Sequence, residues 1–520
     1  MGYDVSDYQR IYAPYGKVGD VDKLLEACHV RGMKLILDLV INHTSSQHEW
    51  FKASRSSKDN AKRDWYIWRP ARYDQEGRRQ PPTNWRGYFA GPTWTWDEAT
   101  EEYYLHLYAS DQPDLNWESK SCREAIYDNA IRFWLERGVD GFRVDTVNKY
   151  SKRQDFIDAP VVDPKNDSQP APDMWCNGPR IHEFLKEMTA ETFGPYSAVT
   201  VGELSNTPCE QQVLDYVSAA EKELSMVFQF DMIRLGTGGG FGGKYCFQPW
   251  KLRTLKYFVS KWQKFIEGTD GWTTVFCENH DNGRAVSRFG SDHPDYWARS
   301  AKMIALWQAT LTGTLFLYQG QEIGMTNAPR DWSIDEYKDV ESNSFYQEAL
   351  ASGDKGRVRQ VMDGLRILAR DHSRLPFHWD DSAYAGFTSK ASANPWMRIN
   401  ENYQTINVAK QEEDPDSILS FYKDILKMRK ERCEVFIHGT FELLDEEDEN
   451  VFAYRKSTST SGGETAIVVL SFSQFPRQMP PAVQKLIHGY ECKWKLLKTN
   501  ILGTSCSDTL LPFEGRVYVH

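Results

Sequence analysis

The strongest constraint on the fold is a repeated alternation of apolar, strand-like runs with helix-like segments. Six apolar runs lie at residues 33–41, 139–145, 197–203, 225–231, 273–281 and 313–322. Runs that are apolar nearly throughout are typical of strands covered on both faces of a parallel sheet. Six such strands with intervening helices close more easily into a barrel than they remain an open sheet. The pattern therefore predicts an α/β fold, a (β/α)8-type TIM barrel.

Helical periodicity fills the intervals between these runs. The first predicted helix, residues 20–31, has an apolar stripe, with Asp20 as a candidate N-cap and Gly32 as a stop signal. Further helices are predicted at 119–137, 179–193, 208–222, 250–267 and 296–311. Each predicted helix thus connects one apolar run to the next, as parallel strands require.

Two departures from this alternation predict additional domains. Residues 44–117 form a long excursion dense in Trp and Tyr, which we interpret as an inserted, loop-rich subdomain B. From residue 430 the chain consists of short strand-like runs separated by turns and free of helical periods, which predicts a C-terminal antiparallel β domain over 430–520. The catalytic barrel would then comprise residues 1–43 and 118–429.

Composition excludes several classes of protein. The chain has 520 residues and a net charge of −11, which argues against nucleic acid because binding to phosphates requires clustered Lys and Arg. Nine scattered cysteines without a CxxC pair predict a reduced, cytoplasmic protein with no metal centre. No run has the length of a membrane span, and the amino-terminal residues lack the pattern of a signal peptide. We expect no membrane partner, no cofactor and a monomer.

The run "VDGFRVDTV" at residues 139–147 places two charged residues in an apolar strand. Residues i and i+2 of a strand point to the same face, so the side chains of Arg143 and Asp145 should touch. Taken alone, this pair favours a structural ion pair, because buried charges are tolerated mainly when they are paired. A functional interpretation needs partners elsewhere in the chain.

Such partners follow several of the other predicted strands. The polar residues at the carboxyl ends of the runs are Asp38, Asn42, His43, Glu203, Asn279, His280 and Asp281. In α/β barrels this end of the strands carries the active site. Any single carboxylate could be a capping or ion-pairing residue, but the joint placement of Asp145, Glu203 and Asp281 favours a catalytic role.

Paired carboxylates point to a specific chemistry. Retaining glycoside hydrolysis requires two carboxyl groups about 5 to 5.5 Å apart, one attacking the anomeric carbon and one transferring the proton. Asp145, beside the cation of Arg143, is expected to stay ionised and to act as the nucleophile. Glu203 follows an apolar run and is expected to hold its proton and act as the acid.

Five ordered motifs carry a resemblance to a known family. They are "DLVINH" (38–43), "QPDLN" (112–116), "GFRVD" (141–145), "VGEL" (201–204) and "ENHD" (278–281). In order and spacing they resemble the motif set of the α-amylase family of retaining glycoside hydrolases. The segments "GYDVSDY" (2–8) and "RLPFHW" (374–379) are similar to the branch of α-glucosidases and oligo-1,6-glucosidases, especially fungal maltases.

The resemblance implies roles for individual residues. Asp145 would be the nucleophile, Glu203 the acid/base, and Asp281 the carboxylate that clamps the hydroxyls of the reacting sugar. The residues expected to bind substrate are Tyr3, Asp38, His43, Phe89, Tyr108, Gln112, Arg143, Thr146, His280 and Arg374. Thr146 lies where maltose-preferring members carry Thr and isomaltose-preferring members carry Val. The expected substrate is therefore a small oligosaccharide with a terminal α-1,4-linked glucose, such as maltose, with sucrose as a further candidate.

One departure from the family pattern concerns the amino terminus. Family members begin upstream of the segment matching residues 2–8, with a first strand, a first helix and a second strand. The resemblance therefore implies a barrel that is incomplete at its N-terminus, with about six of eight strands. Reduced activity is the corresponding expectation.

Three alternatives stay open at this point. An α-1,6-preferring oligoglucosidase would use the same three carboxylates. A transglycosylase or sucrose isomerase would also use them and would differ in how water is excluded. A non-catalytic barrel relative acting as a binding partner belongs to another class, and the retention of all three carboxylates argues against it.

A glycine-rich segment at residues 236–245 carries two further signals. Gly238, Gly240 and Gly243 have GxGxxG spacing, and a near-Walker pattern ends at Lys244. Tyr245 replaces the required Ser or Thr, and no helix is predicted to follow at once. We therefore predict a flexible loop at the rim of the barrel and no nucleotide site.

Overall fold

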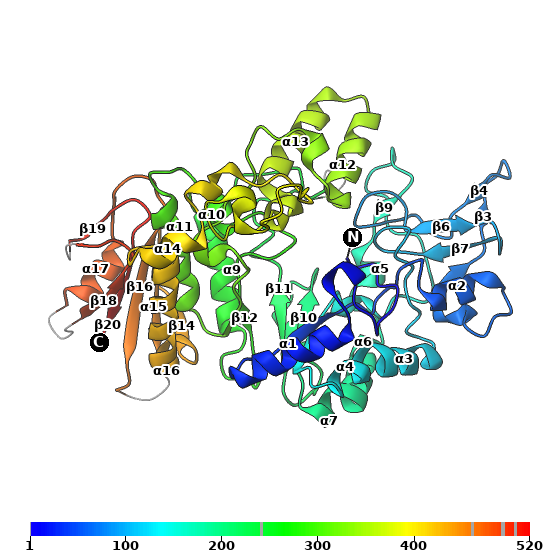
Figure 1. Cartoon of the computed structure of the whole chain (residues 1–520), viewed down its shortest axis with the longest axis horizontal. Coiled ribbons are helices and arrows are strands. Elements are labelled where there is room, and N and C mark those ends of the chain that lie inside the picture. Colours follow the sequence, from blue (N-terminus) through cyan, green and yellow to red (C-terminus); the bar gives the residue numbers. More distant parts are fainter. Residues whose placement is uncertain (1, 240–242, 459–461, 490–493, 504–506) are drawn as a thin grey trace. The chain divides into compact units, whose positions relative to one another are not determined.

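The computed structural model of the chain describes residues 2–239, 243–458, 462–489, 494–503 and 507–520. It divides into two compact units (Figure 1). Unit 1 comprises Met1–Phe230 with Thr269–Trp272, and unit 2 comprises Asp231–Gly268 with Thr273–His520.

Unit 1 is built on a four-stranded parallel sheet. Its strands, in spatial order, are β1 (Ile36–Leu39), β8 (Gly141–Val144), β10 (Val199–Leu204) and β11 (Met226–Gln229). The first four predicted strands are therefore confirmed. The expectation of burial on both faces holds for the inner strands β8 and β10 but not for the first half of β1, where Ile36 and Leu37 are only partly buried. The reason is that β1 lies at one edge of this sheet.

Helices connect these strands, as the sequence predicts. They are α1 (Val18–Val30), α3 (Lys120–Ile126), α4 (Phe133–Leu135), α6 (Ile181–Met188), α7 (Gly194–Tyr196) and α8 (Glu210–Val217), with π-helical turns at Tyr127–Arg132 and Thr189–Phe193. The prediction that Asp20 is the N-cap of the first helix is wrong. The helix begins at Val18, and the Asp20 carboxylate accepts a hydrogen bond from the backbone N–H of Lys17 at 3.1 Å.

The predicted insert folds as small sheets around an aromatic core. β7 (Glu102–Leu105) pairs antiparallel with β2 (Trp68–Arg69) and β6 (Trp94–Asp97). β5 (Trp85–Arg86) pairs with β9 (Gln169–Pro170), which lies outside the insert in sequence. The buried cluster contains Trp85, Trp94 and also Trp175. Residues 156–176 thus contribute to this core, and the predicted boundaries of subdomain B and of the other domains stay predictions.

Unit 2 contains the two remaining predicted barrel strands, β12 (Thr274–Val275) and β13 (Thr314–Leu315), which pair in parallel. Both are much shorter than predicted. After β12, residues 276–281 leave the strand conformation, and after β13, residues 316–320 do the same before a 3-10 helix at Gln321–Ile323. Helices of this unit are α9 (Leu252–Lys264), α10 (Ala285–Phe289), α11 (Trp297–Ala309), α12 (Val340–Ala351), α13 (Lys355–Leu368), α14 (Val408–Glu413), α15 (Ile418–Glu431) and α16 (Cys433–Phe436). The helices predicted at 250–267 and 296–311 are confirmed as α9 and α11.

The predicted C-terminal antiparallel sheet is confirmed in the described part of residues 440–519. Its strands, in spatial order, are β14 (Thr440–Leu443), β15 (Val451–Ser457), β16 (Thr465–Ser471), β20 (Gly515–Val519) and β18 (Lys495–Thr499). The expectation of a region without helix from residue 430 is wrong at α16 and at α17 (Pro481–Ile487). α17 begins at a proline, and its Val483 belongs to the same buried cluster as Val451 and Val469 of the sheet.

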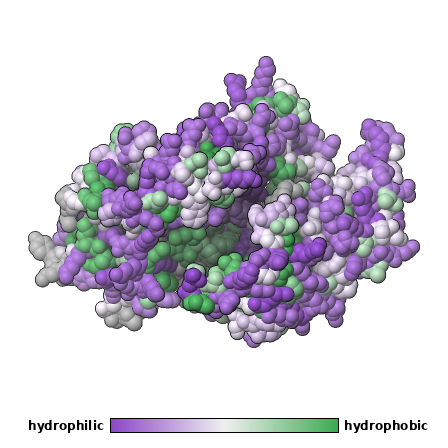
Figure 2. Space-filling view, in the orientation of Figure 1, coloured by the Kyte–Doolittle hydropathy of each residue, from purple (hydrophilic) through white to green (hydrophobic). Residues whose placement is uncertain are grey.

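The face of the molecule seen in Figure 2 carries mostly hydrophilic residues, with apolar residues in separate patches. In the part of the chain that the structure describes, no helix is both long and apolar enough to cross a bilayer.

Candidate active site

Arg143 is the centre of a charge cluster in unit 1. Its Nη1 atom donates to Oδ1 of Asp145 at 2.5 Å, which confirms the contact predicted from strand alternation. Its Nη2 atom donates to Oε2 of Glu203 at 2.7 Å. Nη1 also donates to Oδ1 of Asp38 at 2.9 Å. Three carboxylates from three neighbouring strands therefore share one guanidinium.

The register of the sheet explains this meeting. Gly202 of β10 lies opposite Val144 of β8, so Glu203 and Asp145 are the next residues on two adjacent strands. Neighbouring strands lie about 4.8 Å apart. The second neighbour of β8 is β1, and its residue Asp38 lies directly opposite Arg143. The parallel register therefore places the two carboxyl groups on neighbouring strands, where both contact the guanidinium of Arg143.

Burial controls the protonation of this cluster. Asp145 and Glu203 are almost fully buried. Burial raises the pKa of Asp145 well above its usual range, the charge of Arg143 opposes this, and the carboxylates of Glu203 and Asp38 add to it. The expectation that Asp145 stays ionised beside Arg143 is therefore not supported. With fewer cations than carboxylates, the cluster favours uptake of a proton.

Thr146 contacts both carboxylates of the pair. Its backbone N–H donates to Oε2 of Glu203 at 3.3 Å, and its hydroxyl donates to Oδ2 of Asp145 at 3.3 Å. Its backbone has φ of 42°, in the left-handed region that β-branched residues rarely adopt. Strained conformations of this kind cluster at functional sites, where the surrounding structure holds them.

A second group of predicted residues adjoins Asp38. The hydroxyl of Tyr3 donates to Oδ2 of Asp38 at 2.5 Å. The backbone carbonyl of Tyr3 lies 3.0 Å from Nε2 of His43 and accepts a hydrogen bond from the side-chain amide of Gln112 at 3.2 Å. Burial lowers the pKa of His43 to about 4, so its ring is neutral at physiological pH. A neutral imidazole suits hydrogen bonding to sugar hydroxyls.

Aromatic rings line the same region. Tyr108 lies 5.2 Å from the ring of His43, stacks on Tyr88 at 5.1 Å and contacts Phe89 at 5.5 Å. The Lys149 ammonium lies over the Tyr88 ring at 4.7 Å. Tyr88 and Lys149 were not predicted as site residues, because an aromatic or a lysine in such a segment has no distinctive sequence signal.

The remaining three predicted residues lie together in unit 2. Arg374 donates from Nη2 to Oδ1 of Asp281 at 2.9 Å and from Nε to the carbonyl of His280 at 3.0 Å. The His280 ring lies 3.5 Å from the Asp281 carboxylate. Ten predicted site residues therefore lie together in unit 1 and three in unit 2, and their union in one pocket stays a prediction.

Two cations that the sequence analysis did not select also hold Asp281. Arg370 lies 3.3 Å from Oδ1 of Asp281, and Lys244 donates to its backbone carbonyl at 2.7 Å. Burial opposes ionisation of Asp281, but the charges of Arg370, His280, Arg374 and Lys244 outweigh it and hold the pKa of the carboxyl well below its usual range. Asp281 is therefore an ionised acceptor for hydrogen bonds.

Two further carboxylates position these cations. Glu341 accepts from Nε of Arg370 at 2.9 Å, and Asp339 accepts from Nη1 of Arg374 at 2.6 Å. Both come from the start of α12, where Asp339 is the N-cap residue. The glycine-rich segment that contains Lys244 was predicted as a flexible loop, and its residues 240–242 lie outside the described part of the chain.

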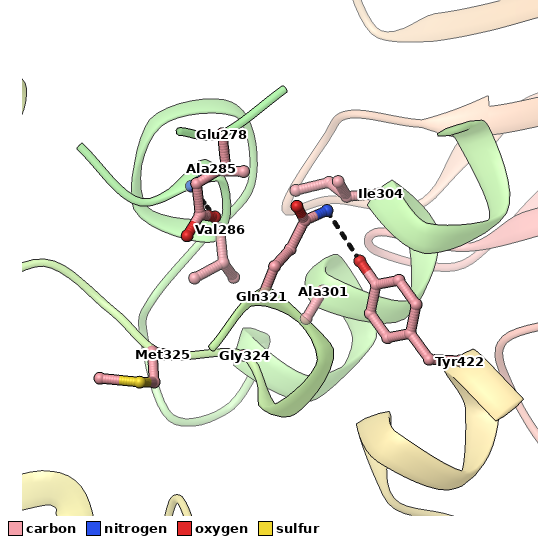
Figure 3. Close-up of a pocket in the computed structure, with 9 residues that line it drawn as sticks. All are labelled: Glu278, Ala285, Val286, Ala301, Ile304, Gln321, Gly324, Met325 and Tyr422. Atoms are coloured by element: carbon pink, nitrogen blue, oxygen red, sulfur yellow. Dashed lines mark hydrogen bonds between the residues drawn. The ribbon is translucent and has the colours of Figure 1, made fainter. Parts of the chain in front are cut away.

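A small cavity of about 10 Å³ also lies in unit 2, between α10, α11 and α15 (Figure 3). Its polar lining includes Glu278, Gln321 and Tyr422, and Gln321 donates to the Tyr422 hydroxyl at 2.9 Å. Glu278 belongs to the "ENHD" motif but forms a buried ion pair with Arg284 at 2.6 Å. A space of this size admits at most one water molecule, so it is not a sugar site.

The fold and the site define a class of protein: an α/β barrel-type hydrolase with carboxylates at the carboxyl ends of its parallel strands. The chain belongs to the α-amylase family, because the family model for the α-amylase catalytic domain matches residues 1–439.

Curated relatives and solved structures agree with this assignment. An α-glucosidase of Candida albicans is 49% identical, over 100% of this chain and 89% of the relative. An oligo-1,6-glucosidase of Parageobacillus thermoglucosidasius is 43% identical, over 91% of this chain and 80% of the relative. The crystal structure of an isomaltulose synthase from Klebsiella sp. LX3 matches with a TM-score of 0.90 at 35% identity, covering 100% of this chain and 89% of that one.

Proposed function

We propose that this chain is a retaining α-glucosidase that releases terminal α-1,4-linked glucose from maltose-like oligosaccharides. The observation that carries the proposal is the pair Asp145 and Glu203, held by one guanidinium at the ends of adjacent parallel strands. The curated relatives that match over the full length are named α-glucosidase or oligo-1,6-glucosidase, which supports the same activity.

The proposed reaction uses the pair in two steps. Glu203 donates its proton to the glycosidic oxygen while the Asp145 carboxylate attacks the anomeric carbon and forms a covalent glucosyl-enzyme. Glu203, now ionised, removes a proton from water, which attacks the same carbon and releases glucose with retained configuration. The excess of carboxylates over cations around Arg143 supplies the one proton that the first step needs. Asp281, held ionised, accepts hydrogen bonds from hydroxyls of the reacting sugar.

The linkage preference follows from Thr146. Its hydroxyl contacts the Asp145 carboxylate, and Thr at this position resembles the maltose-preferring members of the family. An α-1,6-preferring activity is the second candidate, since several relatives are named oligo-1,6-glucosidase. Sucrose isomerisation is a weaker candidate that depends on the solved isomaltulose and trehalulose synthases at 35–36% identity.

One experiment tests activity, linkage and stereochemistry together. The protein and its Asp145→Asn variant are incubated with maltose, isomaltose and sucrose, and the first-formed glucose is followed by proton NMR. We expect rapid release of α-glucose from maltose, slower release from isomaltose, and no release by the variant. First-formed β-glucose would contradict the retaining mechanism, and faster hydrolysis of isomaltose would support the second candidate.

We also propose that the protein is a monomer of the cytoplasm. In the described part of the chain, seven cysteines are free, which fits a reducing compartment. Sedimentation equilibrium of the purified protein tests the monomer, and a mass near twice 60.2 kDa would contradict it.

A further inference from the structure

A group of exposed aromatic side chains lies in the segment 377–396 of unit 2. Trp379, Phe387 and Trp396 are 51%, 46% and 54% exposed. A large aromatic ring that leaves half of its surface in water forgoes part of the favourable free energy of burial, and contiguous exposed apolar surface marks binding sites. Nothing in the catalytic proposal uses these rings.

Two hydrogen bonds connect this segment to Asp281. The indole N–H of Trp396 donates to the backbone carbonyl of Arg374 at 2.7 Å, and Arg374 in turn donates to Asp281 at 2.9 Å. Because its only polar group is already engaged, Trp396 presents an apolar face. The rings form two pairs, Phe377 with Trp379 at 4.6 Å and Phe387 with Trp396 at 5.1 Å. We name these four residues the aromatic rim.

The backbone that carries the aromatic rim is held in an unusual conformation. Tyr384, Ala385 and Gly386 all have left-handed φ values, of 58°, 55° and 68°. The backbone N–H of Trp379 donates to the carbonyl of Ala385 at 2.9 Å, and Ala385 is fully buried. Two non-glycine residues in this region cost about 1 kcal/mol each or more, a cost that persists where structure fixes the segment. The rings are therefore presented by a defined turn.

We propose that the aromatic rim binds the outer, reducing-end glucose units of a malto-oligosaccharide whose terminal glucose is held at Asp281. This inference rests on the proposed function and adds a preference for chain length. The C–H faces of a glucose ring are apolar and pack on aromatic faces, while its hydroxyls remain in water. The rim offers such faces and lies one arginine side chain away from the carboxylate that clamps the sugar.

The size of the rim favours a sugar over a protein. Three half-exposed aromatic side chains present roughly 230–380 Å² of surface. A stable protein interface needs about 800 Å² from each partner. Two glucose rings need far less, so an oligosaccharide fits the exposed surface and a second copy of this chain does not.

The test compares substrates of different length. Wild type, Trp379→Ala and Phe387→Ala are assayed for kcat/KM on maltotetraose and on an aryl α-glucoside, whose single sugar cannot reach the rim. We expect the ratio of maltotetraose to aryl glucoside to fall about 3- to 10-fold for each ring removed. Phe475→Ala, which removes another exposed phenylalanine, is the matched control and should leave the ratio unchanged. A ratio unaffected by Trp379→Ala in a folded protein would overturn the inference.

Binding separates this inference from the proposed function. Maltose and maltotetraose are titrated into Asp145→Asn by calorimetry, with and without Trp379→Ala. Tighter binding of maltotetraose that disappears with Trp379→Ala supports the rim even if the wild type hydrolyses nothing. If the protein hydrolyses maltose but the rim variants show the same dependence on oligosaccharide length as wild type, the proposed function stands and the inference is rejected. A change of sedimenting mass in Trp379→Ala without a change in the ratio would assign the rim to contacts between copies and reject it too.

Discussion

The Nη2 atom of Arg143 donates to Oε2 of Glu203 at 2.7 Å. The sequence favoured an apolar surrounding for Glu203, whereas the structure gives it a cation that it shares with Asp145 and Asp38. The two members of the pair therefore differ less in their environment than expected. Which of them carries the proton is a property of the coupled pair and changes when substrate brings the glycosidic oxygen to Glu203.

The first prediction concerns Asp145→Asn. We expect hydrolysis of maltose to fall by about 10³-fold or more, because the amide cannot form the glucosyl-enzyme. We also expect a gain in stability. Folding raises the pKa of Asp145, so the stabilisation present below its unfolded pKa of about 3.9 is lost as pH rises through the folded pKa. Asparagine does not ionise, so the variant does not lose this stabilisation as pH rises.

Thermal unfolding at pH 4 and pH 7.5 measures this second effect. The melting temperature of Asp145→Asn relative to wild type should be higher at pH 7.5 than at pH 4. An equal difference at both pH values would show that Asp145 is not destabilised by its ionisation. Active-site groups often reduce the stability of a protein, so their removal can raise it.

The second prediction tests the cations around Asp281. Arg370→Met removes the first of the charges that hold this carboxyl ionised, so the pKa of Asp281 should rise towards its usual range. We expect kcat/KM on maltose to fall about 10- to 100-fold, and its acidic limb to move to higher pH. Arg359→Met, an exposed arginine of the adjoining helix α13, is the control and should behave as wild type. An unchanged pH profile in Arg370→Met would show that the remaining cations keep Asp281 ionised without Arg370.

Strand periodicity explains why the centre of the site was predictable. The spacing of Arg143 and Asp145 fixes a shared face, and parallel strands place their carboxyl ends together. Glu203 could therefore be assigned to the same site from the sequence alone. Lys244 and Arg370 could not be found in the same way. They come from a glycine-rich segment and from the turn after α13, and only tertiary packing brings them to Asp281.

The aromatic rim shows the same limit. An aromatic side chain in a sequence predicts burial first, and the exposure of Trp379 and Trp396 depends on a turn with three left-handed residues. Of these three, only Gly386 signals its conformation by residue type. Tyr384 and Ala385 adopt it because Ala385 is buried and its carbonyl accepts from Trp379, contacts that no local pattern encodes.

The third prediction concerns linkage preference. Thr146→Val removes the hydroxyl that donates to Asp145 but keeps the branched side chain, so the left-handed backbone is no more strained than before. We expect the ratio of kcat/KM for maltose to that for isomaltose to fall by about 10-fold, within the 1–3 kcal/mol that one pocket contact contributes to discrimination. Thr146→Ser keeps the hydroxyl and should keep the preference. If valine leaves the ratio where it was, Thr146 is not the selector.

The last prediction concerns a buried lysine far in sequence from the site. Lys456 of β15 is completely buried and donates to the carbonyl of Gly439 at 2.6 Å and to the hydroxyl of Thr312. Burial lowers its pKa from 10.5 to about 7. Between these values the unfolded chain holds a proton that the folded chain has released, so the contribution of Lys456 to stability rises with pH from about 7 to about 10.5.

Lys456→Met should therefore stabilise the protein most at the lower end of this range. Thr312 already donates to the same carbonyl at 2.7 Å, so methionine leaves these two groups paired. We expect the melting temperature of the variant to exceed that of wild type by about 2–4 °C at pH 6.5, with the difference shrinking by pH 9.5. Lys495→Met, at an exposed position of β18, controls for loss of a positive charge and should show no such dependence. A constant difference from pH 6.5 to pH 9.5 would mean that Lys456 stays charged in the folded protein, held by the dipoles of Thr312 and Gly439.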